Sequence, residues 1–85
     1  MNKTIVDVRT PEEYAPGHVK GSINIPLQEL NTRLDEIKEI KGDIILCCAS
    51  GVRSAKAYRL LQQNGFSNMS NGGSWMDIDA LLVNH

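Results

Sequence analysis

The sequence lacks the features that define several common protein classes. Its 85 residues contain two cysteines. Because these are adjacent, as Cys47 and Cys48, no disulfide between them closes a loop across the domain, and we expect free thiols. There is no dense run of lysine and arginine and the formal net charge is -1, which argues against nucleic acid or an anionic membrane as a partner. No apolar run approaches the roughly 20 residues of a membrane span.

The overall composition is that of one ordinary globular domain. Hydrophobic residues make up 41% of the chain and charged residues 22%, which is typical of folded rather than disordered or fibrous chains. A chain of this length buries a small core, and we expect a single domain over residues 1–85. We also expect a monomer. With reduced thiols and no visible signal peptide, we expect a cytoplasmic location, or a periplasmic one if a signal was removed.

The first half of the chain predicts two strands and two helices. Apolar and β-branched residues predict a strand over residues 4–8, and alternation of polar and apolar residues predicts another over residues 22–25. Between them, Thr10 is placed to cap a helix, with Pro11 at its first position and Glu13 closing a capping box. Further on, apolar residues at helical spacing predict one amphipathic helix that ends at Gly42 and packs on the core, namely Leu27, Leu30, Leu34, Ile37 and Ile40.

The second half predicts two further strands and two further helices. The continuous apolar run at residues 43–47 predicts a strand covered on both faces, as in a parallel sheet. A helix is expected over residues 54–64, with Gly65 in the left-handed conformation after its end. A last strand is expected at residues 66–70, a turn at Asn71–Gly73, and a final helix capped by Ser74. Strands that alternate with helices predict an α/β fold with helices on both faces of a mainly parallel sheet.

The segment Cys48–Ser54 is the strongest candidate for chemistry, because it joins a predicted strand to a predicted helix. Active sites of α/β folds lie at the carboxyl ends of strands, and the backbone N–H groups of a helix start favour an anion there. These donors, the helix dipole and the nearby guanidinium of Arg53 stabilise a thiolate, so we expect a lowered pKa for Cys48. Gly51 permits the backbone angles that so tight a loop needs. Arg53 also offers planar, permanently charged donors to an oxyanion.

Five segments resemble, in order and spacing, the sequence pattern of rhodanese-like domains. They are D-V-R at residues 7–9, P-E-E-Y at 11–14, G-H-V-K-G-S-I-N-I-P at 17–26, C-A-S-G-V-R-S at 48–54 and G-G-S-W at 72–75. The short length resembles the compact phage-shock-type members of this family. The resemblance implies a small three-layer α/β domain, with a mainly parallel central sheet of about four to five short strands and helices on both faces.

The resemblance also implies an activity and a set of site residues. Cys48 would accept a sulfane sulfur from a small anionic donor such as thiosulfate, and pass it from a persulfide to cyanide or a thiol, which is covalent catalysis. A sulfur-accepting protein is a further candidate partner. The resemblance implies no cofactor and no metal. The loop residues whose amides would hold the persulfide, with Arg53 orienting the donor, are Ala49, Ser50, Gly51, Val52, Arg53 and Ser54.

Cys47 supports a rival interpretation. Counted from Cys47, the spacing to Arg53 is C-x5-R, as in cysteine-dependent phosphatases and arsenate reductases, so spacing alone leaves both cysteines open. The rhodanese-like pattern places its nucleophile three residues before Gly51, which favours Cys48, and alternation along a strand then turns Cys47 toward the core. A non-catalytic module that binds a protein partner is a third interpretation, disfavoured because inactive family members commonly lack the cysteine that this chain retains.

Four other residues have structural interpretations. Asp7 and Arg9 are expected to form an internal ion pair or hydrogen bond that fixes neighbouring loops, and His18 to support packing near the first strands. Trp75 either lines the mouth of the site or packs in the core.

Overall fold

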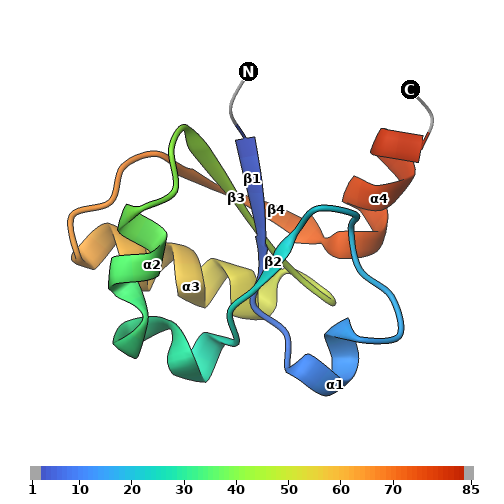
Figure 1. Ribbon diagram of the computed structural model, residues 1–85, viewed down its shortest axis with the longest axis horizontal. Coiled ribbons are helices and arrows are strands. Elements are labelled where there is room, and N and C mark those ends of the chain that lie inside the picture. The colour runs from blue at the N-terminus through green and yellow to red at the C-terminus, as the bar shows by residue number, and fades with distance from the viewer. Residues whose placement is uncertain (1–2, 84–85) are drawn as a thin grey trace.

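The computed structural model describes residues 3–83, which form the expected α/β fold (Figure 1). Within that range, no helix combines the length and the apolar character needed to cross a membrane. In chain order the elements are β1 (Lys3–Asp7), α1 (Pro11–Tyr14), β2 (Ile23–Asn24), the 3-10 helix η1 (Leu27–Thr32), α2 (Leu34–Lys38), β3 (Asp43–Cys48), α3 (Val52–Gln63), β4 (Met69–Ser74) and α4 (Trp75–Val83).

The four strands form one parallel sheet in the order β2-β1-β3-β4. Asp7 of β1 pairs with Cys47 of β3, and Cys48 pairs with Ser74 of β4. Because the strands are parallel, their carboxyl ends meet at one edge of the sheet. The loop after Cys48 therefore lies beside the segment that leads from β1 into α1.

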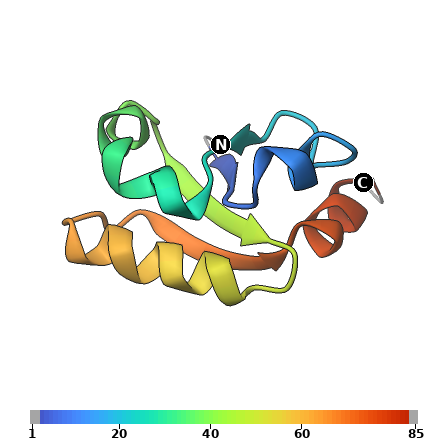
Figure 2. The ribbon, with the colours of Figure 1, turned by 90° about the horizontal axis from the view of Figure 1, so that it is seen from below.

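Helices cover both faces of this sheet, as predicted. Figure 1 shows α2 and α3 on one side of the strands and α1 and α4 on the other, and Figure 2 shows α3 running alongside β3 and β4. Successive residues of a strand point to opposite faces, so alternate residues of β1 and β3 reach the α2–α3 side. The buried core on that side consists of Val6, Val8, Ile25, Leu30, Ile37, Ile44, Leu46, Cys48, Ala57, Leu61 and Met69.

The start of α1 confirms the predicted capping box. The Thr10 hydroxyl accepts a hydrogen bond from the Glu13 amide at 3.3 Å, and the Glu13 carboxylate accepts one from the Thr10 amide at 3.0 Å. Pro11 occupies the first turn, where its missing N–H costs no helical hydrogen bond. The end of α3 is also confirmed, because Gly65 follows it with a φ of +89°, a conformation that glycine adopts without a steric penalty.

The single amphipathic helix expected over residues 27–40 is wrong. The apolar side chains do pack on the core, but the backbone divides into η1 and α2 at Arg33, whose φ of -121° lies outside the helical region. The Thr32 hydroxyl donates to the Glu29 carbonyl at 2.8 Å, and such local bonds compete with a regular α-helix. The periodicity therefore predicted the buried face correctly but not the break.

The turn expected at Asn71–Gly73 is also wrong, because these residues belong to β4. The pairing with β3 shifts at this point, since Leu46 pairs with Asn71 whereas Cys47 pairs with Gly73, which makes Gly72 the extra residue of a β-bulge. A Cβ on Gly72 would approach neighbouring side-chain atoms to 2.7 Å. The glycines that suggested a turn are required instead by this bulge and its close packing.

Candidate functional site

The sulfur of Cys48 is enclosed by the loop that follows β3. The amides of Gly51 and Ser54 donate to Cys48 Sγ at 3.0 Å and 3.4 Å, and the thiol donates to Ser54 Oγ at 3.5 Å. The Ser54 amide belongs to the first turn of α3, where N–H groups have no partner within the helix. The Cys48 side chain is fully buried. The donors at the start of α3 therefore converge on this sulfur.

These donors decide the protonation of Cys48. Burial raises the pKa of a thiol and is the largest single influence here. Hydrogen bonds to the thiolate act in the opposite direction: one from the Ser54 hydroxyl, once its proton turns to the sulfur, and others from the amides of Ser54, Gly51 and Ser50. Together they bring the pKa of Cys48 below its ordinary value of 9.0. The site therefore favours the thiolate, which is the nucleophilic form.

Gly51 gives the loop its shape. Its φ is +98°, a conformation that side chains disfavour. A Cβ at this position would lie 3.4 Å from the Cα of Gly73 on β4. Gly51 therefore allows the chain to turn its N–H toward Cys48 while its backbone rests closely against β4.

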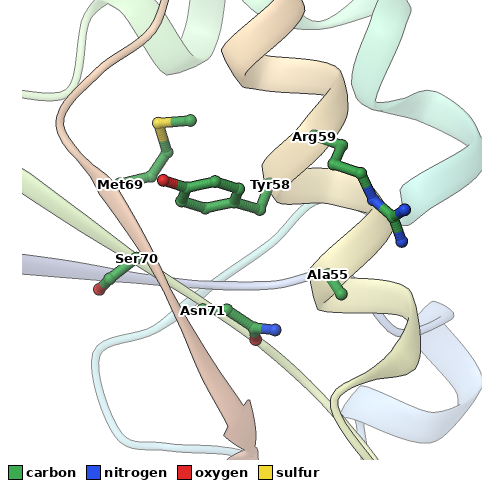
Figure 3. A pocket seen from close by; sticks show the side chains of 6 residues that line it. All are labelled: Ala55, Tyr58, Arg59, Met69, Ser70 and Asn71. Atoms are coloured by element: carbon green, nitrogen blue, oxygen red, sulfur yellow. The ribbon is translucent and has the colours of Figure 1, made fainter.

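Asn71 on β4 completes the network around the sulfur and was missed by the sequence analysis. Its Oδ1 accepts from the Ser54 hydroxyl at 2.6 Å and from the Gly73 amide at 3.0 Å. Figure 3 shows its side chain between β4 and α3. In the sequence, Asn71-Gly72-Gly73 predicts a turn, because the strand pairing that carries Asn71 to the loop is not a local pattern.

Arg53 is bound to a neighbouring carboxylate rather than aimed freely at a ligand. Its guanidinium donates to the two Glu13 oxygens at 2.6 Å and 2.9 Å, a bidentate geometry that favours charged partners. Hydrogen bonds, first from Arg53 and then from the Thr10 amide, lower the pKa of Glu13 to about 2. The pair ties α1 to the start of α3, and an anion at Arg53 would share it with Glu13.

Cys47 lies on the opposite face of β3, in a different environment. It is fully buried and faces the ion pair of Asp7 and Arg9, whose closest atoms are 2.8 Å apart. Burial, followed by the negative charge of Asp7 and opposed by that of Arg9, raises the pKa of Cys47 to about 12. Cys47 is therefore buried in the interior, as predicted, beside an ion pair, and it stays protonated at neutral pH.

The ion pair is itself held by several further groups. Arg9 donates to the carbonyls of Glu13 and Gly17 at 3.1 Å and 2.9 Å, and Trp75 stacks on its guanidinium at 4.6 Å from the ring centroid. Trp75 thus packs on Arg9 and is half-buried. His18 also has a structural role, since its ring stacks on Tyr14 and its Nδ1 is 2.8 Å from the Tyr14 carbonyl.

Two surface pockets border this arrangement. One, of about 500 Å³, lies between α3 and β4 and shares Asn71 with the network around Cys48 (Figure 3). The other, of about 200 Å³, includes Arg53 and the segment after β1. Across residues 3–83, no three His, Cys, Asp or Glu side chains gather in a way that would hold a metal ion. The first pocket is lined by Ala55, Tyr58, Arg59, Met69, Ser70 and Asn71.

Comparison with known proteins identifies the family of the chain that carries this site. The model of the rhodanese-like domain matches residues 1–77. The chain belongs to the rhodanese-like family. Thiosulfate sulfurtransferase PspE of Escherichia coli is 38% identical to this rhodanese-like domain over 74 residues, which cover 86% of this chain and 71% of the relative. The putative sulfur carrier protein YrkF of Bacillus subtilis is 40% identical over 67 residues, but the match spans 79% of this chain and 36% of that longer protein.

Solved structures support the same assignment for this rhodanese-like domain. A structure described as rhodanese with anions from E. coli has a TM-score of 0.79 and 34% identity, covering 88% of this chain and 89% of its own. A rhodanese-related protein from Thermoplasma volcanium has a TM-score of 0.78 and 33% identity, covering 95% of this chain and 79% of its own. Relatives named as sulfurtransferases support sulfur transfer of the rhodanese type for this family member.

Proposed function

We propose that this chain is a sulfurtransferase that carries a sulfane sulfur as a persulfide on Cys48, taken from a donor such as thiosulfate. The observation that carries the proposal is the convergence of the Gly51 and Ser54 amides on Cys48 Sγ, at 3.0 Å and 3.4 Å. Backbone N–H groups at a helix start stabilise a negative charge on sulfur by hydrogen bonding, without transferring a proton to it. These donors favour the Cys48 thiolate, which attacks the donor in the first step and departs again in the second.

The proposed reaction has two nucleophilic steps. The Cys48 thiolate attacks the outer sulfur of thiosulfate, a sulfur–sulfur bond forms to Cys48, and the donor's own sulfur–sulfur bond breaks with its electron pair leaving on sulfite. Cyanide or a thiolate then attacks the outer sulfur of the persulfide, and the Cys48 thiolate departs with the electron pair. Because sulfite and the Cys48 thiolate both leave as anions, no general acid is required.

The remaining loop residues have supporting roles in this proposal. Ala49, Ser50 and Val52 contribute backbone to the loop, and Arg53 attracts the anionic donor while sharing its charge with Glu13. The partners are a small anionic sulfur donor and a thiol, cyanide or sulfur-accepting protein.

The phosphatase-like alternative based on Cys47 has weaker support. Cys47 is buried on the face of β3 away from the loop, with a pKa raised to about 12. A nucleophile for a phosphate ester has to lie within the anion-binding loop as a thiolate, and Cys47 meets neither condition. The C-x5-R spacing to Arg53 therefore does not correspond to a shared site.

The test compares the two adjacent cysteines as a matched pair. Wild type, Cys48→Ala and Cys47→Ala are incubated with thiosulfate, and the intact masses and the rate of thiocyanate formation from cyanide are measured. We expect wild type and Cys47→Ala to gain one sulfur atom and turn over, and Cys48→Ala to do neither. Sulfur addition that persists in Cys48→Ala contradicts the proposal. Wild type that binds a protein partner but takes up no sulfur would indicate the non-catalytic module instead.

A further inference from the structure

The orientation of the Asn71 amide group is fixed by its neighbours. The Gly73 N–H lies 3.0 Å from one terminal atom of the Asn71 side chain, and a backbone N–H only donates. That atom is therefore the carbonyl oxygen Oδ1. The Asn71 amide nitrogen then faces the Gly51 carbonyl at 3.5 Å, an acceptor, which is consistent with the same assignment.

This orientation determines where the single proton of the Ser54 hydroxyl points. Ser54 Oγ lies 2.6 Å from Asn71 Oδ1, 3.1 Å from the Gly51 carbonyl and 3.5 Å from Cys48 Sγ. A carbonyl oxygen accepts only, so the shortest contact requires Ser54 to donate to Asn71. The Gly51 carbonyl already accepts from the Ala55 amide at 3.1 Å. Ser54 therefore presents lone pairs to Cys48, and the Cys48 thiol donates to them.

Ionisation of Cys48 conflicts with this arrangement. A thiolate has no proton to donate, so it faces the lone pairs of Ser54 Oγ unless the hydroxyl turns toward the sulfur. Turning gives a charge-assisted hydrogen bond to sulfur but breaks the 2.6 Å bond to Asn71. In a persulfide formed on Cys48 the charge lies on the outer sulfur, so this demand on the hydroxyl arises in the thiolate.

We propose that Asn71 is a positioning residue for Cys48: by holding the Ser54 proton it favours the protonated thiol, and it releases that proton to the sulfur when Cys48 becomes anionic. The inference rests on the proposed function only for its purpose in sulfur transfer, since the hydrogen-bond competition exists whatever the substrate. Asn71 does not contact the reacting sulfur; it acts through Ser54.

The charged groups around Cys48 are otherwise unaffected by Asn71. On the α3 side, Arg53 is paired with Glu13 of α1. On the other face of the sheet lie Cys47 and the Asp7–Arg9 pair. Within residues 3–83, the Asn71 side chain donates to the Gly51 carbonyl and to none of these charged groups. An uncharged residue in place of Asn71 therefore changes the partner of the Ser54 hydroxyl and leaves these charged groups as they are.

The experiment titrates the Cys48 thiolate directly. All proteins carry Cys47→Ala, so one thiol remains, and the ultraviolet absorbance of the thiolate is followed against pH. With Asn71→Ala, Ser54 is free to donate to the thiolate, and we expect the pKa of Cys48 to fall by about half a unit to one unit. The control is Asn68→Ala, which removes an asparagine that binds the Gly42 carbonyl, and we expect no shift from it.

A double-mutant cycle separates positioning from a general loosening of the loop. In a Ser54→Ala background the hydroxyl is absent, so Asn71→Ala is expected to leave the pKa of Cys48 unchanged. A rise or no change with Asn71→Ala alone, or an equal fall in the Ser54→Ala background, overturns the proposal. The titration needs no turnover, so it remains decisive for Asn71 even if the protein fails to take sulfur from thiosulfate. If transfer does occur, its pH profile shifts to lower pH with Asn71→Ala by the same amount.

Discussion

The two faces of β3 at its carboxyl end provide adjacent cysteines with opposite chemistry. Cys47 and Cys48 are both fully buried, yet the pKa of Cys47 is raised to about 12 and that of Cys48 is lowered. Burial raises the pKa of both thiols, so burial does not distinguish them. The difference arises because three backbone amides and a hydroxyl surround one sulfur, whereas the other faces the carboxylate of Asp7.

The two faces also differ in what holds them together. The Cys47 face is organised by side chains, with Arg9 bonded to Asp7 and to two backbone carbonyls while Trp75 covers it. The Cys48 face is organised by the backbone of the loop and the start of α3. Substitutions of side chains should therefore damage stability on the first face, and substitutions that alter backbone conformation should change reactivity on the second.

The largest effect is expected from Arg9→Met. The substitution leaves the Asp7 carboxylate, which is fully buried, without its charge partner, and breaking a buried pair in this way costs about 3–5 kcal/mol of unfolding free energy. Urea denaturation measures the loss. Arg59→Met, which removes an exposed arginine from α3, is the control and should change stability little. Equal stability of the two variants would show that the Cys47 face does not depend on this ion pair.

The next effect concerns alkaline stability and depends on Cys47. In the folded protein its pKa is about 12, against an ordinary value of 9.0. Between these two pH values, Cys47 is deprotonated in the unfolded chain and protonated in the folded chain. Its contribution to the unfolding free energy is therefore complete below the lower value and falls by about 1.4 kcal/mol per pH unit above it. Cys47→Ala removes this contribution, so its unfolding free energy should fall less steeply with pH than that of wild type.

Cys48→Ala serves as the matched control for this alkaline effect. Because the pKa of Cys48 is lowered by folding, its contribution to stability is complete above the ordinary value and is lost as pH falls through the lowered one. Removing Cys48 should therefore leave the alkaline decline in place. Denaturation midpoints for both variants, taken in steps between pH 9.0 and about 12, would contradict the comparison if the two cysteines gave the same slope.

Local sequence patterns were sufficient for several of the elements, whereas the preference for Cys48 over Cys47 also needed the resemblance to rhodanese-like domains. The capping box of α1, the β3 run and Gly65 are all read within a few residues, and alternation along a strand places Cys47 and Cys48 on opposite faces. What each face meets depends on pairing between distant segments. The sequence therefore did not show that Asn71 reaches from β4 to Ser54 on α3. It also did not show that Glu13 pairs with Arg53, which lies 40 residues further along the chain.

Gly51→Ala tests whether the backbone conformation controls the Cys48 face. Both Gly51 and Gly65 have positive φ, at +98° and +89°, so alanine at either costs about 1–2 kcal/mol of stability. Only the Gly51 amide donates to the Cys48 sulfur. We therefore expect Gly51→Ala to raise the pKa of Cys48, measured by thiolate absorbance, while Gly65→Ala lowers stability without moving this pKa. A shift of the same size in both variants would assign the effect to general destabilisation.

The smallest effect is expected from Glu13→Gln, which removes the charge that Arg53 now shares. Glutamine still serves as the N3 residue of the capping box, so the helix start is retained, and because the pair is partly exposed the change in stability should be slight. An anionic donor then meets an uncompensated guanidinium at Arg53, and we expect the KM for thiosulfate to fall about twofold, with kcat unchanged. Glu12→Gln removes a neighbouring exposed charge and controls for net charge. If both variants lower KM equally, the gain reflects long-range charge alone, and Glu13 does not compete with the donor for Arg53.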